Sequence, residues 1–410
     1  MNKIIPGMAA VLAMLAIWPS CRAPASVVAG PADVRMSPAR LGRLDAIVQE
    51  AVSRKDFPGA VLLVGRNGKI AYRKAFGESQ WVPDHLKINA GMIFDLASLT
   101  KPVATATSIM ILVEQGRLSL DEKVKSYVPE FSAFTDCGGK AGEDARIWHL
   151  LTHTSGLPPY TDAAEVEKYF GGPCTTEQLV GYISGLKKTG PPGQAFDYSC
   201  LGYITLAHIL SKITGQTIAS FSREKIFKPL RMDHTFFMPE EKYIDLCVPT
   251  QVINGKPLRG VVHDPLARLQ GGISGNAGLF STADDLAVFA EMMLGGGRYK
   301  GIRILGPLAA ARMTSVWPKA AFAGRGLGWD VVSAYSSSRG DLFGPGSYGH
   351  SGYTGTSIWI DPETRTYVIF LTNSVHPDDK GSVLALRSRV ANVVAASILD
   401  WQPGKTPQEK

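Results

Sequence analysis

Strand-like patterns lie near both ends of this 410-residue chain, and helix-like patterns fill the stretch between them. The first pair of strand patterns flanks Asn67-Gly68, a dipeptide typical of a tight β-hairpin. Alternating or β-branched runs predict strands at 60–66, 69–76, 326–333, 355–361 and 365–373. An isolated hairpin is barely stable in water, so we expect both ends of the chain to build one antiparallel sheet.

Helical periodicity accounts for most of the other segments. The first helix, from Ser37 to about Arg54, carries an apolar side made by Leu41, Leu44, Ile47, Val48 and Ala51. Further helices are expected at 99–115, 176–187, 200–213, 217–227, 282–294 and 382–399. The predicted fold is therefore α+β, an α/β sandwich in which helices flank the antiparallel sheet. We expect a sheet subdomain at about 37–97 and 287–400 and a mostly helical subdomain at about 98–286, with the ligand site between them.

Residues 1–25 have the pattern of an export signal. Lys3 precedes an apolar stretch from Gly7 to Pro19, which is shorter than the ~20 residues that a membrane-spanning helix needs. Ala23-Pro24-Ala25 offers small residues before a cut at Ser26, while Cys21 leaves a lipoprotein signal as an alternative. No later segment is long enough to span a membrane, so we expect a periplasmic or extracellular protein.

The charge of the chain disfavours nucleic acid as a partner. The net charge is +7, and removal of Lys3 and Arg22 with the signal leaves +5. There is no polybasic run and no interleaving of basic and aromatic residues.

We expect a small-molecule or muropeptide substrate and a monomeric protein.

Four cysteines remain after the expected cleavage, namely Cys137, Cys174, Cys200 and Cys247. Their spacing fits no zinc pattern. Disulfides persist outside the cytoplasm, and Cys137 and Cys174 both lie in glycine-rich loops. Two interpretations remain open: a Cys137–Cys174 disulfide, or four free thiols.

Ser-x-x-Lys occurs three times, as Ser98–Lys101, Ser184–Lys187 and Ser222–Lys225. Only Ser98 opens a helix pattern after an apolar approach, and a separation of three residues brings both side chains onto one helical face. A lysine withdrawn from water has a lowered pKa and can accept the serine proton. The alternative is that Ser98 caps the helix and Lys101 is solvated.

Two downstream motifs favour the catalytic interpretation. "FDYSC" places Tyr198 just before a helix pattern, and "YGHSGYTG" places His350-Ser351-Gly352 before a strand. In this order the motifs resemble the serine β-lactamase and penicillin-binding protein superfamily, in particular the class C β-lactamase-related group of esterases, DD-peptidases and amidases. The resemblance covers about residues 37–400 and includes the segments 148–157, 191–210 and 326–329.

The resemblance implies a role for each motif residue. Ser98 would form an acyl-enzyme, Lys101 would keep it deprotonatable, and Tyr198 would pass the proton to the leaving group. The backbone amides of Ser98 and Tyr353 would bind the oxyanion. His350, Ser351 and Gly352 would lie along the substrate.

Two positions depart from the family pattern. Cys200 stands where the family usually has a polar side chain, commonly Asn, that contacts the substrate amide. His350 replaces the lysine of true lactamases, so we expect a weaker and pH-dependent positive charge there. Efficient β-lactam hydrolysis is therefore not expected.

A second stretch, Gly260–Leu286, resembles the subgroup that includes DD-carboxypeptidases and exo-acting muramyl-L-alanine amidases. It suggests a substrate loop with His263, Asp264 and Asn276, the last of which stands where the subgroup commonly has His. The alternative is that His263-Asp264 only holds the loop in place.

These observations predict an exported serine hydrolase that acts through an acyl-enzyme on amide or ester bonds. Peptidoglycan-derived molecules are the expected substrates. A broad carboxylesterase or class C-like β-lactamase is the enzyme alternative, and a slow-acylating sensor of cell-wall fragments or β-lactams is the non-catalytic one. No cofactor is expected. No metal is expected either, because His149 and His153 lack the glutamate of a His-Glu-x-x-His motif.

Overall fold

The computed structural model describes residues 27–402. The expected export signal, with Cys21, lies outside these residues. Within them, no helix combines the length and the apolar character that a membrane crossing requires.

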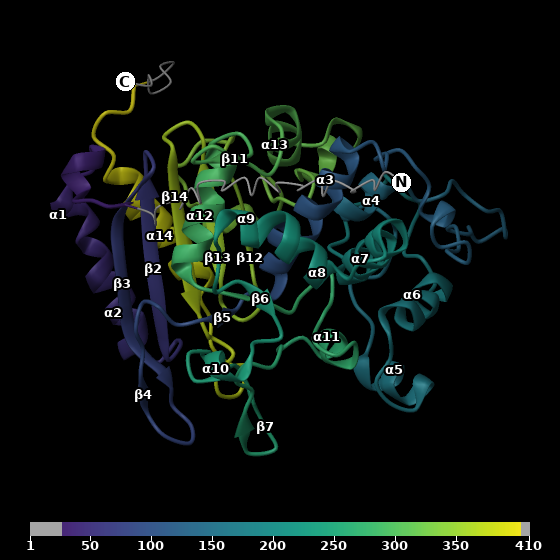
Figure 1. Cartoon of the computed structure of the whole chain (residues 1–410), viewed down its shortest axis with the longest axis horizontal. Coiled ribbons are helices and arrows are strands. Elements are labelled where there is room, and N and C mark those ends of the chain that lie inside the picture. The colour runs from purple at the N-terminus through teal and green to yellow at the C-terminus, as the bar shows by residue number, and fades with distance from the viewer. Residues whose placement is uncertain (1–26, 403–410) are drawn as a thin grey trace, which may run out of the picture.

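The main sheet has seven strands and draws its central strands from both ends of the chain, as predicted (Figure 1). Its order in space is β1 (Val27–Val28), β3 (Lys69–Gln80), β2 (Gly59–Arg66), β14 (Thr366–Thr372), β13 (Ser357–Asp361) and β12 (Tyr348–Ser351), with β4 (Leu86–Lys87) paired to β3. β2 is antiparallel to both β3 and β14. β2, from the first hairpin, and β14, the last strand along the chain, are therefore neighbours in the middle of the sheet.

The predicted hairpin between β2 and β3 is confirmed. Asn67 and Gly68 have φ angles of 51° and 77°, and a two-residue hairpin turn of this kind needs positive φ at both central positions. Asparagine tolerates this conformation and glycine adopts it freely, so the local sequence determines the register of the pair.

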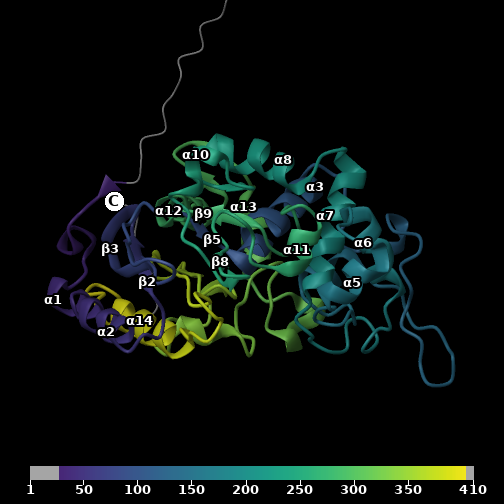
Figure 2. The same ribbon diagram turned by 90° about the horizontal axis from the view of Figure 1, so that it is seen from below.

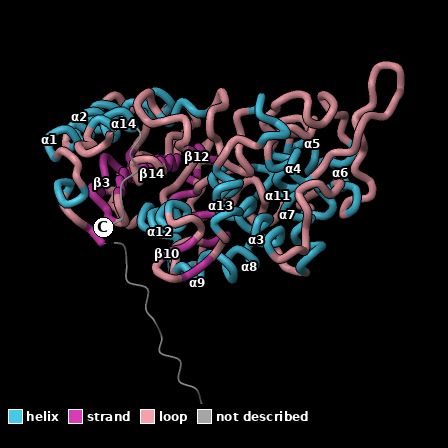
Figure 3. Tube along the Cα trace, turned by 90° about the horizontal axis from the view of Figure 1, so that it is seen from above, coloured by secondary structure: helices cyan, strands magenta, loops and turns pink. Residues whose placement is uncertain are grey.

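β2 is buried along its whole length because both faces of the sheet are covered. Val61 and Leu63 face the larger core, while Leu62 and Val64 face the smaller one. The smaller core lies under α1 (Pro38–Leu41), α2 (Arg43–Ser53) and α14 (Leu384–Ala396), and α12 (Ala283–Leu294) covers the opposite face. Figures 2 and 3 show the strands between these two helical layers.

The middle of the chain is mostly helical, and most of its helices lie to the right of the sheet in Figure 1. Its helices are α3 (Thr107–Glu114), α4 (Ile147–Leu151), α5 (Ala163–Phe170), α6 (Thr176–Gly185), α7 (Cys200–Thr214), α8 (Ile218–Ser222), α9 (Lys228–Leu230), α10 (Glu241–Ile244) and α11 (Pro265–Leu269), followed beyond α12 by α13 (Pro307–Thr314). The short strands are β5 (Phe94–Asp95), β6 (Phe236–Phe237), β7 (Val252–Ile253), β8 (Lys256–Pro257), β9 (Leu279–Ser281), β10 (Arg298–Tyr299) and β11 (Ile302–Arg303).

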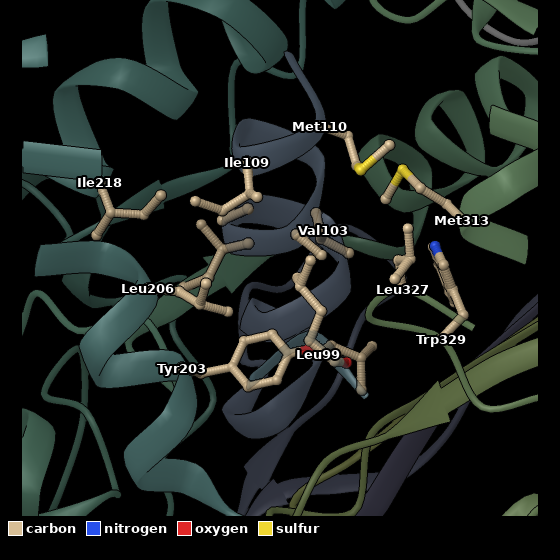
Figure 4. Packing of buried hydrophobic residues seen from close by; sticks show 14 of the residues in the cluster. Leu99, Val103, Ile109, Met110, Tyr203, Leu206, Ile218, Met313, Leu327 and Trp329 are labelled. Atoms are coloured by element: carbon tan, nitrogen blue, oxygen red, sulfur yellow. The ribbon is translucent and has the colours of Figure 1, made fainter. Parts of the chain in front are cut away.

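The segment that contains Leu99, Val103 and Ile109 runs through the centre of the larger core. Figure 4 shows Tyr203, Leu206 and Ile218 on one side of it and Met313, Leu327 and Trp329 on the other. Burial on all sides makes this segment a rigid base for the residues at its beginning.

The predicted strand at 326–333 is wrong. This stretch is irregular and contributes only isolated bridges, from Asp330 to Arg325 and to Gly349. Gly328 has φ of 94°, and a side chain there would collide with Ala106. The chain is bent here because it must pass close to the central helix, and β12, which we did not predict, forms the edge of the sheet instead.

The predicted Cys137–Cys174 disulfide is also wrong, and the alternative of free thiols holds for all four cysteines within residues 27–402. Cys137 lies exposed in a loop, whereas Cys174 is buried in the larger core just before α6. The two side chains therefore lie in different environments.

Glu291 gives the fold a testable pH dependence. This side chain of α12 is 9% exposed, and burial raises its pKa to about 7. The unfolded chain ionises this group near pH 4.5, so between pH 4.5 and 7 the native state must bind a proton that the unfolded state has lost. We expect the wild-type free energy of unfolding to fall across this window by about 3 kcal/mol relative to that of Glu291→Gln.

Urea unfolding at several pH values checks this prediction, with exposed Glu167→Gln on α5 as the matched control. The control should follow the wild type. Parallel pH profiles for wild type and Glu291→Gln would contradict it.

Candidate active site

Ser98 and Lys101 lie in contact at the start of the central helical segment. Ser98 is in a 3₁₀ turn, Ala97–Leu99, and Lys101 begins a π-helical turn, Lys101–Ala106, that leads into α3. The Lys101 ammonium (Nζ) donates to Ser98 Oγ at 3.0 Å. A helix pattern was predicted here, but not the π turn; π turns are rare and occur frequently at functional sites.

Lys101 is fully buried and has two further partners. Its Nζ donates to the backbone carbonyl of Asn276 at 3.0 Å and contacts Cys200 Sγ at 3.4 Å. The lysine is thus held between three segments of the chain, and the solvated alternative for Lys101 is excluded.

The charge of Lys101 depends on its neighbours. Burial lowers the pKa of the ammonium, but the ionised forms of Cys200 and Tyr198 outweigh burial and raise the pKa. Burial also raises the pKa of the Cys200 thiol. Near neutral pH the Cys200 thiol is therefore protonated. A neutral thiol does not raise the Lys101 pKa as a thiolate would, so the lowering of this pKa by burial is less fully opposed.

The two rival Ser-x-x-Lys pairs do not form comparable sites. Ser184 Oγ donates to Val180 O, and Ser222 Oγ donates to Ile218 O, both at 2.7 Å inside helices. Their hydroxyl groups are buried and occupied. Lys187 and Lys225 are exposed.

Tyr198 lies beside Lys101, with the ammonium 5.1 Å from the centre of its ring. The His153 ring stacks on the Tyr198 ring, with 4.3 Å between the ring centroids. Its Nδ1 accepts a hydrogen bond from the Ser199 amide at 3.0 Å. His153 therefore positions Tyr198, a role that we did not predict. It lies beyond the end of α4 with φ of 58°, so it does not share a helix with His149.

Asp95 organises the backbone in front of Ser98. One carboxylate oxygen accepts from the Ala97 amide at 2.8 Å and the other from the His263 amide at 2.7 Å. Ala97 has a φ of 46°, which is unfavourable for a residue with a Cβ atom. Burial raises the Asp95 pKa to about 6, and these two hydrogen bonds support the strained turn that presents Ser98.

The turn after β12 is attached to the same backbone by two threonines. Thr354 Oγ1 donates to Asp95 O at 2.7 Å, and Thr356 Oγ1 donates to Leu96 O at 3.0 Å. This brings Tyr353 next to Ser98. Among the hydrogen bonds of residues 27–402, none uses the backbone amide of either residue as donor. Both amides are thus available for an oxyanion.

His350 differs from the cation expected there. Its Nδ1 lies 2.8 Å from the Ser351 carbonyl, to which it donates, and its buried Nε2 has no partner within the described chain. Burial, with Arg325 and Lys101 nearby, lowers its pKa well below the usual value. His350 is therefore neutral at pH 7 and presents an acceptor, which corrects the prediction of a pH-dependent positive charge.

These elements surround a cleft of about 390 Å³. The predicted residues that line it are Ser98, Tyr198, His350, Ser351, Gly352 and Tyr353. Lys101 and Cys200 lie behind them, while Arg325, Asp330, Tyr335, Arg387 and several residues of the 374–384 loop complete the lining without having been predicted.

The predicted substrate-loop residues are not in the lining. Asp264 caps α11 by accepting from the Ala267 amide at 2.8 Å, and its second oxygen accepts from Asn276 Nδ2 at 3.2 Å. Asn276 in turn supplies the carbonyl that receives Lys101. His263 stacks on Tyr353 at 5.7 Å. These residues support the site from behind, in agreement with the alternative that they hold the loop.

Within the described part of the chain, no group of His, Cys, Asp and Glu residues is arranged to hold a metal ion.

Gly352 provides a test of the site geometry. A methyl group on it would collide with Thr356 Oγ1 and with the Leu96 carbonyl, so Gly352→Ala must displace the turn that carries Tyr353. We expect hydrolysis of a p-nitrophenyl ester to fall by at least about a hundredfold, the lower end of the range for loss of one oxyanion donor.

Gly346→Ala is the matched control, because a methyl group there meets nothing within 4 Å. Melting temperatures of both variants separate a local effect from unfolding. Wild-type rates for a folded Gly352→Ala protein would show that the turn does not serve the reaction.

Known proteins share both the sequence and the fold of this chain. Residues 44–392 match the Beta-lactamase family model. The N-acetylmuramyl-L-alanine amidase of Bacillus subtilis (strain 168) is 31% identical over 371 residues, which cover 83% of this chain and 82% of the relative. A protein of Escherichia coli (strain K12) named "Putative D-alanyl-D-alanine carboxypeptidase" is 31% identical over 368 residues, or 82% of this chain and 83% of the relative.

Among solved structures, the hydrolase EstCE1, described as having promiscuous acyltransferase activity, aligns with a TM-score of 0.71 and 23% identity. The alignment covers 87% of this chain and 99% of that one. At this identity the likeness shows the fold alone. Together with the family match over most of the chain, these findings show that the chain belongs to the β-lactamase family of serine hydrolases.

Proposed function

We propose that this protein is an exported hydrolase that forms an acyl-enzyme at Ser98 and cleaves amide or ester bonds in peptidoglycan-derived substrates. One observation carries the proposal: the buried Lys101 ammonium group contacts Ser98 Oγ at the edge of a cleft. Export is supported by the signal-like residues 1–25.

In acylation, Ser98 Oγ attacks the substrate carbonyl, and its proton passes to the Lys101–Tyr198 pair. Lys101 must be neutral to accept a proton directly; when it is charged it stabilises the Tyr198 phenolate, which then takes the proton. The free amides of Ser98 and Tyr353 hold the developing oxyanion. Collapse of the tetrahedral intermediate breaks the bond to the leaving group, which receives the proton from Tyr198. Water then attacks the ester carbonyl and releases Ser98.

The substrate class is supported by the relatives. By their names, the B. subtilis relative cleaves muramyl-L-alanine amides and the E. coli relative removes a terminal D-alanine. Both names describe an amide bond to the nitrogen of an alanine. We therefore propose an alanine-containing muropeptide as the substrate of this chain.

Two contacts argue against efficient β-lactam turnover. Cys200 offers Lys101 only a thiol, which is a weak donor and acceptor, where the family pattern commonly has an amide side chain. His350 is neutral and cannot replace a lysine as the partner of a lactam carboxylate. An activated ester depends less on either contact, because its leaving group departs more easily. The site therefore favours muropeptides and activated esters over cephalosporins.

Hydrolysis rates of three substrates, and of two serine variants, test the proposed function. Purified protein should release amino acid from a muropeptide and p-nitrophenol from a short ester, with little turnover of a cephalosporin. Ser98→Ala should lower both activities by several orders of magnitude, whereas Ser222→Ala, which alters the buried serine of a rival pair, should retain them when folded. Product masses and absorbance provide the measurement.

The outcomes discriminate between the alternatives. Ester hydrolysis without any muropeptide cleavage would favour the carboxylesterase. A cephalosporin rate equal to the best ester rate would favour the lactamase. A single burst of acylation without turnover would favour the sensor.

A further inference from the structure

Arg325 is a buried cation on the wall of the cleft that the proposed reaction leaves unused. Its side chain is 1% exposed, and it lines the cleft together with Ser98 and Tyr198. Its Nε and Nη2 atoms have no hydrogen-bond partner within residues 27–402. A guanidinium group offers five donors in a fork that matches a carboxylate, so these unused donors can bind an anionic group.

The neighbouring carboxylate does not fully satisfy Arg325. Asp330 Oδ2 lies 3.7 Å from Nη1, which is an ion pair but too long for a hydrogen bond. The other oxygen of Asp330 accepts from Ser333 Oγ at 2.7 Å. Asp330 therefore offsets part of the charge and leaves hydrogen-bonding capacity on the guanidinium group.

Among the described residues, Arg325 is the cationic group of the site with the most unused donors. Lys101 is surrounded by its three partners, and His350 is neutral. Arg387 also lines the cleft and its Nε has no partner within residues 27–402, but its Nη2 donates to the carbonyls of Gly352 and Thr356 at 3.2 and 2.8 Å. This arrangement makes Arg387 a positioning residue for the turn.

The place of Arg325 indicates which part of a substrate it meets. Its guanidinium carbon lies 5.8 Å from the centre of the Tyr198 ring. Tyr198 is the residue that protonates the leaving group in the proposed reaction. A carboxylate bound at Arg325 therefore belongs to the leaving side of the scissile bond and not to the acyl side.

We propose that Arg325 binds the free α-carboxylate of the amino acid that leaves, and so selects substrates cleaved at a terminal residue. The inference rests on the proposed function for the identity of the leaving side. It makes Arg325 a specificity-determining residue.

The test measures binding without turnover. In the Ser98→Ala background, calorimetry compares N-acetyl-D-alanyl-D-alanine with its C-terminal amide, which differs only in the carboxylate. We expect the carboxylate ligand to bind at least about tenfold more tightly, as a charge-assisted bidentate pair should. Arg325→Gln should abolish this preference and leave the affinity for the amide unchanged within about threefold.

Two further variants make the result decisive. Arg339→Gln changes an arginine of the same loop that is outside the cleft lining, and it should keep the full preference. Arg325→Lys keeps the charge without the fork and should keep a reduced preference, which decides the matter if the glutamine variant fails to fold.

Three results would overturn the inference: equal binding of both ligands by the Ser98→Ala protein, an unchanged preference in a folded Arg325→Gln protein, or an equal loss of affinity for both ligands. The last would identify Arg325 and Asp330 as a structural ion pair only. Failure of the wild type to hydrolyse muropeptides would contradict the proposed function and not this result, because the binding comparison needs no reaction.

Discussion

The burial of the Lys101 ammonium group is the constraint on which the site depends. A charged amine removed from water must be given acceptors, and here they are Ser98 Oγ, Cys200 Sγ and the Asn276 carbonyl. These partners come from three separate segments of the chain. Holding one cation therefore brings together the central helical segment, the start of α7 and the loop after α11.

The main sheet is connected to the site by hydrogen bonds from two threonine side chains to backbone carbonyls. Thr354 and Thr356, which follow edge strand β12, donate to the carbonyls of Asp95 and Leu96 in front of Ser98. The site thus lies where the edge of the sheet meets the helical region. A shift of either part would separate the nucleophile from the amides proposed to bind the oxyanion, so the fold itself maintains the geometry.

The parts of the fold that could be predicted are those with local causes. Asn67-Gly68 specifies its turn through its own backbone preferences, and the apolar periodicity of 382–399 is enough to identify α14. The region 326–333 has the composition of a strand, but Gly328 must pass close to Ala106, and this long-range contact bends the chain. The π turn at Lys101 likewise results from packing that no local pattern encodes.

The same distinction applies to the site. The positions of Ser98 and Tyr198 follow from short motifs, whereas His153 and Arg325 contact them only through the folded chain. Arg325 directly precedes the Gly326–Trp329 motif that supported the family resemblance, and this adjacency was the one signal that could have pointed to it. The neutral state of His350 depends on burial, which a sequence does not reveal.

Labelling with a fluorophosphonate, followed by peptide mapping, tests the central claim most directly. The account predicts one modified residue, Ser98, with a labelling rate that falls sharply in Lys101→Ala because the nucleophile loses its buried amine. Modification of Ser184 or Ser222 with Ser98 untouched, or an equal labelling rate in a folded Lys101→Ala protein, would contradict it.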